Sequence, residues 1–124
     1  MEFEKRRTNK RILVSLPIHF ETVETPDKRY GDGVSKDISE GGMRIMLERF
    51  FPPKSKFLLK INLGKTNRTI QAMTETIWSV NVRSSHRYYN GMRFLDMNNE
   101  DKSLLKEYLY IKYIKDNIKS NKEN

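Results

Sequence analysis

The 124-residue chain contains no cysteine, which excludes disulfides, thiolate metal sites and a cysteine nucleophile. It also lacks an uninterrupted apolar run of the length that spans a bilayer. Its N-terminus is charged from the second residue and has no apolar segment of the kind found in secretory signals. These absences predict a cytoplasmic protein without a membrane span. The length fits a single domain with a modest hydrophobic core.

Acidic residues are outnumbered, since 16 Asp and Glu stand against 24 Lys and Arg, which gives a formal net charge of +8. Much of the basic charge lies in two segments, an N-terminal arm at residues 5–11 and a C-terminal segment at residues 102–122. A basic surplus attracts any polyanion, so nucleic acid and anionic lipid are both candidate partners. Charge alone does not choose between them.

Most of the chain alternates apolar and polar residues with a period of two, which is typical of half-buried strands. The predicted strands, separated by turn residues, cover about 12–20, 34–38, 43–47, 57–63, 70–82 and 87–95. Trp78 is in phase with the buried side of its strand, so we expect its ring in the core rather than as a platform for base stacking. Many short strands without an intervening helical period favour an antiparallel β-barrel.

The pattern changes to a helical period after residue 98. Asn98 or Asn99 is the expected N-cap, and carboxylates follow in the first turn, where the helix dipole favours them. We expect one apolar face to pack against the barrel or a partner, and its members are Leu104, Leu105, Tyr108, Ile111 and Ile118. Tyr110 and Tyr113 lie off this stripe, so we expect both at the surface.

Two short motifs carry the candidate functional residues. Arg7 and Arg11 form Arg-x-x-x-Arg within the basic arm, and Asp37, Ser39 and Gly42 form Asp-x-Ser-x-x-Gly in a later loop. Alone, the first would be a solvated tail and the second an ordinary turn. Together, in this order and in a short chain, they indicate a site for an anion and a purine.

With these motifs the chain resembles the PilZ domain family, bacterial receptor modules for cyclic di-GMP. The resemblance continues through the strand-like segment 42–45, Trp78 and the segment 90–96, and it covers residues 5 to about 110. It implies a mainly β protein, a small antiparallel PilZ-like β-barrel of six to seven strands with a C-terminal α-helix.

The resemblance and the sequence pattern together divide the chain into three parts. Residues 1–11 form a flexible basic arm that contributes to the ligand site, and residues 12–118 form the barrel with its helix. Residues 119–124 are polar, with nothing to bury, and we expect a frayed tail there.

The ligand implied by the resemblance is cyclic di-GMP, with no cofactor and no metal. Arg7 and Arg11 supply planar forks that pair with guanine O6 and N7 or with phosphate oxygens. Arg6 is a further candidate, because a basic residue at this position of the family is associated with binding a stacked pair of nucleotides.

The second motif supplies complementary chemistry. Asp37 can accept from a guanine edge or orient an arginine, and Ser39 can bond phosphate or an exocyclic amine. Gly42 allows a close approach of the backbone. The division of roles between Asp37 and Ser39 stays open at this point.

The predicted function is a binding module without catalytic activity, since no constellation of acid, base, nucleophile and metal ligand is present. The family implies that the signal passes to a separate effector protein, such as a flagellar, pilus or polysaccharide-synthase component, in the control of motility, exopolysaccharide or biofilm. Two alternatives stay open. One is a basic barrel that binds RNA or single-stranded DNA. The two motifs favour cyclic di-GMP over nucleic acid as the ligand. The other is a PilZ adaptor that works without ligand.

Overall fold

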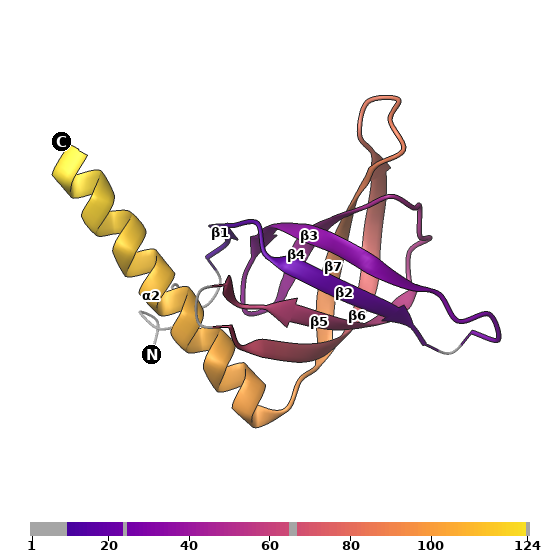
Figure 1. The fold of residues 1–124 in the computed structure, drawn as a ribbon, viewed down its shortest axis with the longest axis horizontal. Helices are drawn as coiled ribbons and strands as arrows, with labels where there is room; N and C mark the ends of the chain where they lie inside the picture. The colour runs from indigo at the N-terminus through magenta and orange to yellow at the C-terminus, as the bar shows by residue number, and fades with distance from the viewer. Residues whose placement is uncertain (1–9, 24, 65–66, 124) are drawn as a thin grey trace.

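The computed structural model describes residues 10–23, 25–64 and 67–123, with side chains described through residue 118. Arg6 and Arg7 lie outside the described residues. The described chain consists of strands followed by one long helix (Figure 1). These elements are β1 (Ile12–Leu13), β2 (Pro17–Thr22), β3 (Tyr30–Ile38), β4 (Gly42–Leu47), β5 (Lys56–Asn62), β6 (Thr69–Asn81), β7 (Tyr88–Asp96) and α2 (Asn99–Glu123).

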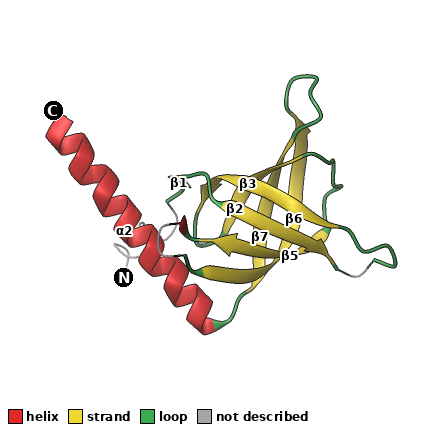
Figure 2. Cartoon of the chain, viewed as in Figure 1, coloured by secondary structure: helices red, strands yellow, loops and turns green. Residues whose placement is uncertain are grey.

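The strands form a closed antiparallel barrel, with α2 lying across one end (Figure 2). Neighbours follow the order β3, β2, β5, β6, β7, β4, and the pairing of β4 with β3 closes the ring. The short strand β1 pairs with β3 along the same edge as β2, nearer the end of β3, in register at Leu13 and Asp37. This six-stranded barrel with an extra strand and a C-terminal helix confirms the predicted fold.

Alternating residues of the strands fill the barrel interior. β5 follows the rule throughout its length, with Phe57, Leu59 and Ile61 buried between partly exposed neighbours. Phe57 also packs edge-on against Phe20 and Phe51, at ring-centroid distances of 5.6 and 4.5 Å. Burial of this apolar surface is the main force that closes the barrel.

The predicted strand 12–20 is divided into β1 and β2 by a side chain of β3. The hydroxyl of Ser35 donates to the carbonyl of Val14 and accepts from the backbone N–H of Leu16. A side chain thereby takes the place of ladder hydrogen bonds where the chain bends between the strands. The burial alternation expected across residues 12–20 is nevertheless present, because Ile12, Leu16 and the apolar residues of β2 all face the core.

Trp78 is not in the core, contrary to the prediction. Thr76 pairs with Met92 and Trp78 with Gly91, so Ile77 is an extra residue on β6. Such a β-bulge reverses the alternation beyond it, because successive side chains point to opposite faces. The indole of Trp78 is therefore on the outer face of the barrel, with 37% of its surface exposed.

Helix α2 begins as predicted, with Asn98 as its N-cap. The Asn98 side-chain oxygen accepts the backbone N–H of Asp101 at 2.7 Å. The helix continues to Glu123, through most of the segment 119–124 for which a frayed tail was expected. In the described part of the chain no helix is both long and apolar enough to cross a membrane.

The face that α2 turns to the barrel differs from the predicted stripe. Leu105 and Leu109 are the buried residues, while Ile111 and Ile118 are about half exposed. Tyr113, expected at the surface, is partly buried against the core. The prediction was wrong for these three residues. The predicted apolar stripe covers more of the helix circumference than the barrel contacts, and part of it faces away from the barrel.

Candidate ligand-binding site

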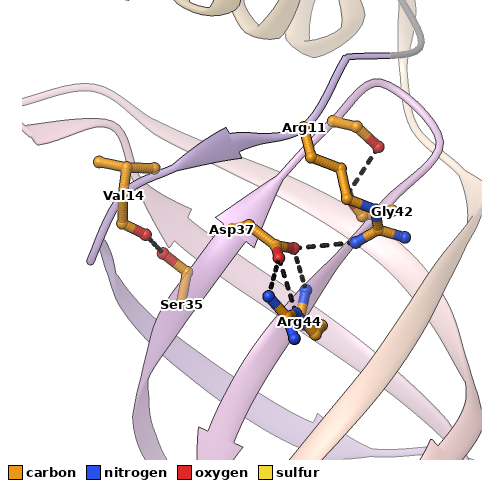
Figure 3. A network of polar contacts seen from close by, with 7 residues as sticks. Arg11, Val14, Ser35, Asp37, Gly42 and Arg44 are labelled. Atoms are coloured by element: carbon orange, nitrogen blue, oxygen red, sulfur yellow. Dashed lines mark hydrogen bonds and ion pairs between the residues drawn. The ribbon is translucent and has the colours of Figure 1, made fainter.

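A buried carboxylate, that of Asp37, is the centre of the candidate site. Asp37 lies near the end of β3, directly opposite Arg44 of β4, and is only 1% exposed. Nε and Nη2 of Arg44 both lie 2.6 Å from its Oδ2. The backbone N–H of Arg44 donates to Oδ1 at 3.2 Å. One arginine is thus fixed to the carboxylate by three of its N–H groups (Figure 3).

Arg11 reaches the same carboxylate from the other side. Its Nη1 lies 2.8 Å from Oδ1 of Asp37, and it is placed there because the adjoining strand β1 pairs with β3. A carboxylate offers about four lone-pair sites, and four N–H groups now occupy them. The described geometry therefore favours the second of the two roles considered for Asp37, that of orienting arginines.

Both guanidinium groups stay accessible although their partner is buried. The side chains of Arg11 and Arg44 are 57% and 36% exposed, against 2% for Asp37. A planar guanidinium has further donors beyond those used on Asp37, and these can face an incoming ligand. The result is a pair of preorganised cations at the barrel surface.

Ser39 and Gly42 close the loop that follows Asp37. The backbone N–H and the hydroxyl of Ser39 both donate to the carbonyl of Gly42, at 2.8 and 3.2 Å. A Cβ atom at Gly42 would lie 2.1 Å from the carbonyl oxygen of Met92 on β7. The close approach expected at this glycine is therefore one between strands β4 and β7.

The strand register places an aromatic ring on the same face as the arginines. Asp37 pairs with Arg44, Arg44 with Gly91 and Gly91 with Trp78, across β3, β4, β7 and β6. Directly opposed residues of neighbouring strands lie about 5 Å apart at Cβ and share a face. The Trp78 indole covers Gly91, since a Cβ built there would meet the ring at 2.4 Å. We call this row of residues the binding row.

Sequence reasoning did not identify Arg44 and misplaced Trp78. Arg44 could have been found, because a loop joining two antiparallel strands brings the residues flanking it together. The outward position of Trp78 could not have been found, because it depends on a β-bulge at Ile77 and no turn-forming residue marks that bulge in the sequence.

Helix α2 touches both sides of the site. Lys106 Nζ lies 3.7 Å from Glu40 Oε1 in the Asp-x-Ser loop. Lys10, next to Arg11, has its Nζ 4.8 Å from the centroid of the Tyr113 ring. A cavity of about 230 Å³ lies beside the first contact, lined by Glu40, Phe94, Leu95, Asp96, Met97, Lys102, Leu105 and Lys106. No group of three or more His, Cys, Asp or Glu within the described ranges could hold a metal ion.

The fold and the site define a small β-barrel domain in which one buried carboxylate holds two arginines at the surface. In a comparison with known protein families, the PilZ domain matches residues 5–110. The chain belongs to this family. No curated protein matches the chain.

Solved structures share the fold at low sequence identity. The Bacillus subtilis inhibitor of motility MotI/DgrA is 18% identical, with a TM-score of 0.71 over 85% of this chain and 50% of that one. Escherichia coli YcgR in complex with c-di-GMP is 19% identical, with a TM-score of 0.70 over 93% and 49%. The PilZ domain of CeSA from a cellulose-synthesizing bacterium is 13% identical, with a TM-score of 0.60 over 82% and 96%. The chain spans about half the length of the first two proteins.

Proposed function

We propose that this PilZ domain is a receptor for cyclic di-GMP that acts on a separate effector protein. The observation that carries the proposal is the Asp37 carboxylate, which holds the guanidinium groups of Arg11 and Arg44 at the barrel surface. Family membership supports the same reading, and the solved YcgR complex contains this nucleotide.

The ligand presents two guanines and two phosphates, and the binding row together with Arg11 offers matching groups. Arg11 and Arg44 donate to guanine O6 and N7 or to phosphate oxygens. The exposed face of the Trp78 indole offers a surface on which a guanine can stack. Gly91 between them carries no side chain, so the Trp78 indole lies directly over it, next to Arg44 in the row.

The remaining residues of the predicted site complete the proposal. Arg6 and Arg7, on the arm before Arg11, supply further cations for the phosphates and the second guanine. Ser39 and Gly42 act by holding the loop that positions Asp37. The proposed domain division keeps the arm as a contributor to the ligand site, and ligand that bridges arm and barrel favours the closed form over the open one.

The effector is a flagellar, pilus or polysaccharide-synthase component in this proposal, and the regulated processes are motility, exopolysaccharide production and biofilm formation. The similarity to an inhibitor of motility and to a domain from a cellulose-synthesizing bacterium supports both kinds of output. The receptor works by binding rather than catalysis. The cytoplasmic location expected from the sequence stays a prediction.

Calorimetric titration of the purified protein with cyclic di-GMP tests the proposal, with GTP, cyclic di-AMP and a short single-stranded oligonucleotide as controls. We expect saturable binding of cyclic di-GMP alone, and the stoichiometry tests the role given to Arg6. Binding of the oligonucleotide with a steep salt dependence and no competition by cyclic di-GMP would favour the nucleic-acid alternative. The absence of binding to all four would favour the ligand-independent adaptor.

A further inference from the structure

Helix α2 carries a second apolar face, separate from the one that packs on the barrel. Leu105 and Leu109 are buried against the barrel, whereas Ile111, Ile114 and Ile118 are 46%, 38% and 50% exposed. At roughly 100° per residue the second group lies on nearly the opposite side of the helix from the first. Ile114 and Ile118 therefore lie off the barrel contact, and Ile111 lies one heptad after Leu104, which packs against the core. Figure 1 shows the C-terminal half of α2 running out beyond the barrel.

The spacing of the exposed isoleucines suits a second helix. Ile111, Ile114 and Ile118 follow one another at intervals of three and four residues, which is the pattern of a helix–helix seam. Leu104, one heptad earlier, packs against the barrel core, so the exposed stripe begins at Ile111. A contact of this form buries apolar side chains of both helices along a narrow line.

The charge of α2 argues against a polyanion as the occupant of this face. Although the whole chain carries a formal charge of +8, α2 over Asn99–Glu123 is nearly balanced. Six lysines, Lys102, Lys106, Lys112, Lys115, Lys119 and Lys122, stand against five carboxylates, Glu100, Asp101, Glu107, Asp116 and Glu123. Membrane-surface helices and nucleic-acid contacts require a surplus of Lys and Arg. The balance favours another helix of mixed charge.

The placement of two of these charges makes the face complementary to itself. Glu107 and Lys115 lie four residues before and four after Ile111, both are exposed, and neither forms an ion pair with another described residue. When two copies of α2 pair in antiparallel orientation about Ile111, Glu107 of each copy faces Lys115 of the other. A parallel pair would place like charges together. Ile111 is also the middle residue of Asn99–Glu123, so the antiparallel pair overlaps over the full helix.

We propose that this face of α2 is an isologous dimer interface, occupied by α2 of a second copy of this chain in antiparallel orientation. The two-fold axis passes beside Ile111, with Glu107 of each copy facing Lys115 of the other. The same patch serves both subunits, as two-fold symmetry requires. The barrels then lie on the outer sides of the helix pair, and the binding rows are not part of the interface.

Sedimentation velocity of the full chain over a range of concentrations tests the proposal, since the monomer mass is 14.8 kDa. We expect the wild type to sediment as a dimer at high concentration and Ile111→Asp as a monomer throughout. Asn117→Asp, which adds the same carboxylate at an exposed position off the stripe, is the matched control and should leave the dimer intact. Far-UV circular dichroism of each variant checks that the helix is retained.

Charge reversal then tests the antiparallel pairing itself. Glu107→Lys and Lys115→Glu should each weaken self-association, because each creates two like-charge contacts. An equimolar mixture of the two variants, and the double variant, should restore it. A wild-type monomer at every concentration would overturn the proposal, as would a dimer indifferent to all these substitutions. Binding of a monomeric protein to anionic vesicles through Ile111 would also overturn it and assign the face to a membrane.

Discussion

Arg44 and Asp37 form a cross-strand pair in which the buried carboxylate accepts from the side chain and the backbone of the same arginine. This arrangement keeps the guanidinium in one orientation before any ligand arrives. Ligand binding then does not have to pay the entropy of ordering that side chain. The pair is the structural reason for proposing that the binding row recognises the ligand.

Neutralising Asp37 should release both arginines. In Asp37→Asn the new amide N–H₂ faces guanidinium donors and cannot accept from them. We expect cyclic di-GMP affinity, measured by calorimetry, to fall at least tenfold, and the free energy of unfolding to fall by about 1–3 kcal/mol. Asp32→Asn on the same strand is the matched control, because the Asp32 side chain is 87% exposed and should change neither quantity. Equal affinity of the two variants would contradict the role given to Asp37.

Trp78 should report ligand binding directly, because it is the only tryptophan of the chain. A guanine that stacks on its exposed face should quench the indole fluorescence with the same apparent affinity that calorimetry gives. Trp78→Leu should weaken binding about tenfold while leaving the barrel folded, since the ring lies outside the core. Saturable binding in calorimetry with unchanged fluorescence would place the ligand away from β6.

Gly42 and Gly41 should respond very differently to the same substitution. A methyl group at Gly42 would overlap the carbonyl of Met92, a backbone atom that cannot move aside without shifting β7. We expect Gly42→Ala to lower the free energy of unfolding by roughly 3 kcal/mol. Gly41→Ala meets no atom within 4 Å and should change it by less than about 0.5 kcal/mol. Urea denaturation of the two variants measures both, and equal stabilities would show that the loop is not packed as described.

Tyr108 should make stability depend on alkaline pH. Burial, with the charge of Asp116 adding to it, raises the pKa of Tyr108 above its ordinary value of 10.0. The unfolded tyrosine therefore ionises first, so the stabilisation is complete below pH 10.0 and is lost as the pH rises from there through the folded pKa. Above pH 10.0 the free energy of unfolding should fall more steeply in the wild type than in Tyr108→Phe. Tyr110→Phe, at an exposed position, is the control, and identical slopes in the wild type and Tyr108→Phe would refute the assignment.

The strands of the barrel were predicted well where buried and exposed residues alternate without interruption. In β4 and β5 every second residue is buried, so the alternation leads directly to the structure. It failed where backbone irregularity decides the outcome. The bulge at Ile77 moves Trp78 to the outer face, and Ser35 divides one predicted strand into two. Neither feature leaves a signal in hydrophobic periodicity.

The candidate site was predictable in part. Arg11 and Asp37, one residue from each motif, are in contact, and ligand binding at these residues stays a prediction. Arg44 was not predicted, because its role depends on which residues face each other across the loop. The apolar stripe of α2 was read as one face, whereas the helix has two, with Leu109 on the first and Ile114 on the second.

Calorimetric titration of cyclic di-GMP into the wild type, Arg44→Ala and Arg29→Ala tests the central claim most directly. Arg29 precedes β3 at the end of that strand away from Asp37, and its side chain is 53% exposed. We expect saturable binding in the wild type, unchanged binding in Arg29→Ala and a tenfold to hundredfold loss in Arg44→Ala, about 1–3 kcal/mol. The same Arg44→Ala protein should still fold, though with a free energy of unfolding lower by about 3 kcal/mol. Equal affinity of a folded Arg44→Ala protein and the wild type, or no binding by the wild type, would contradict the account.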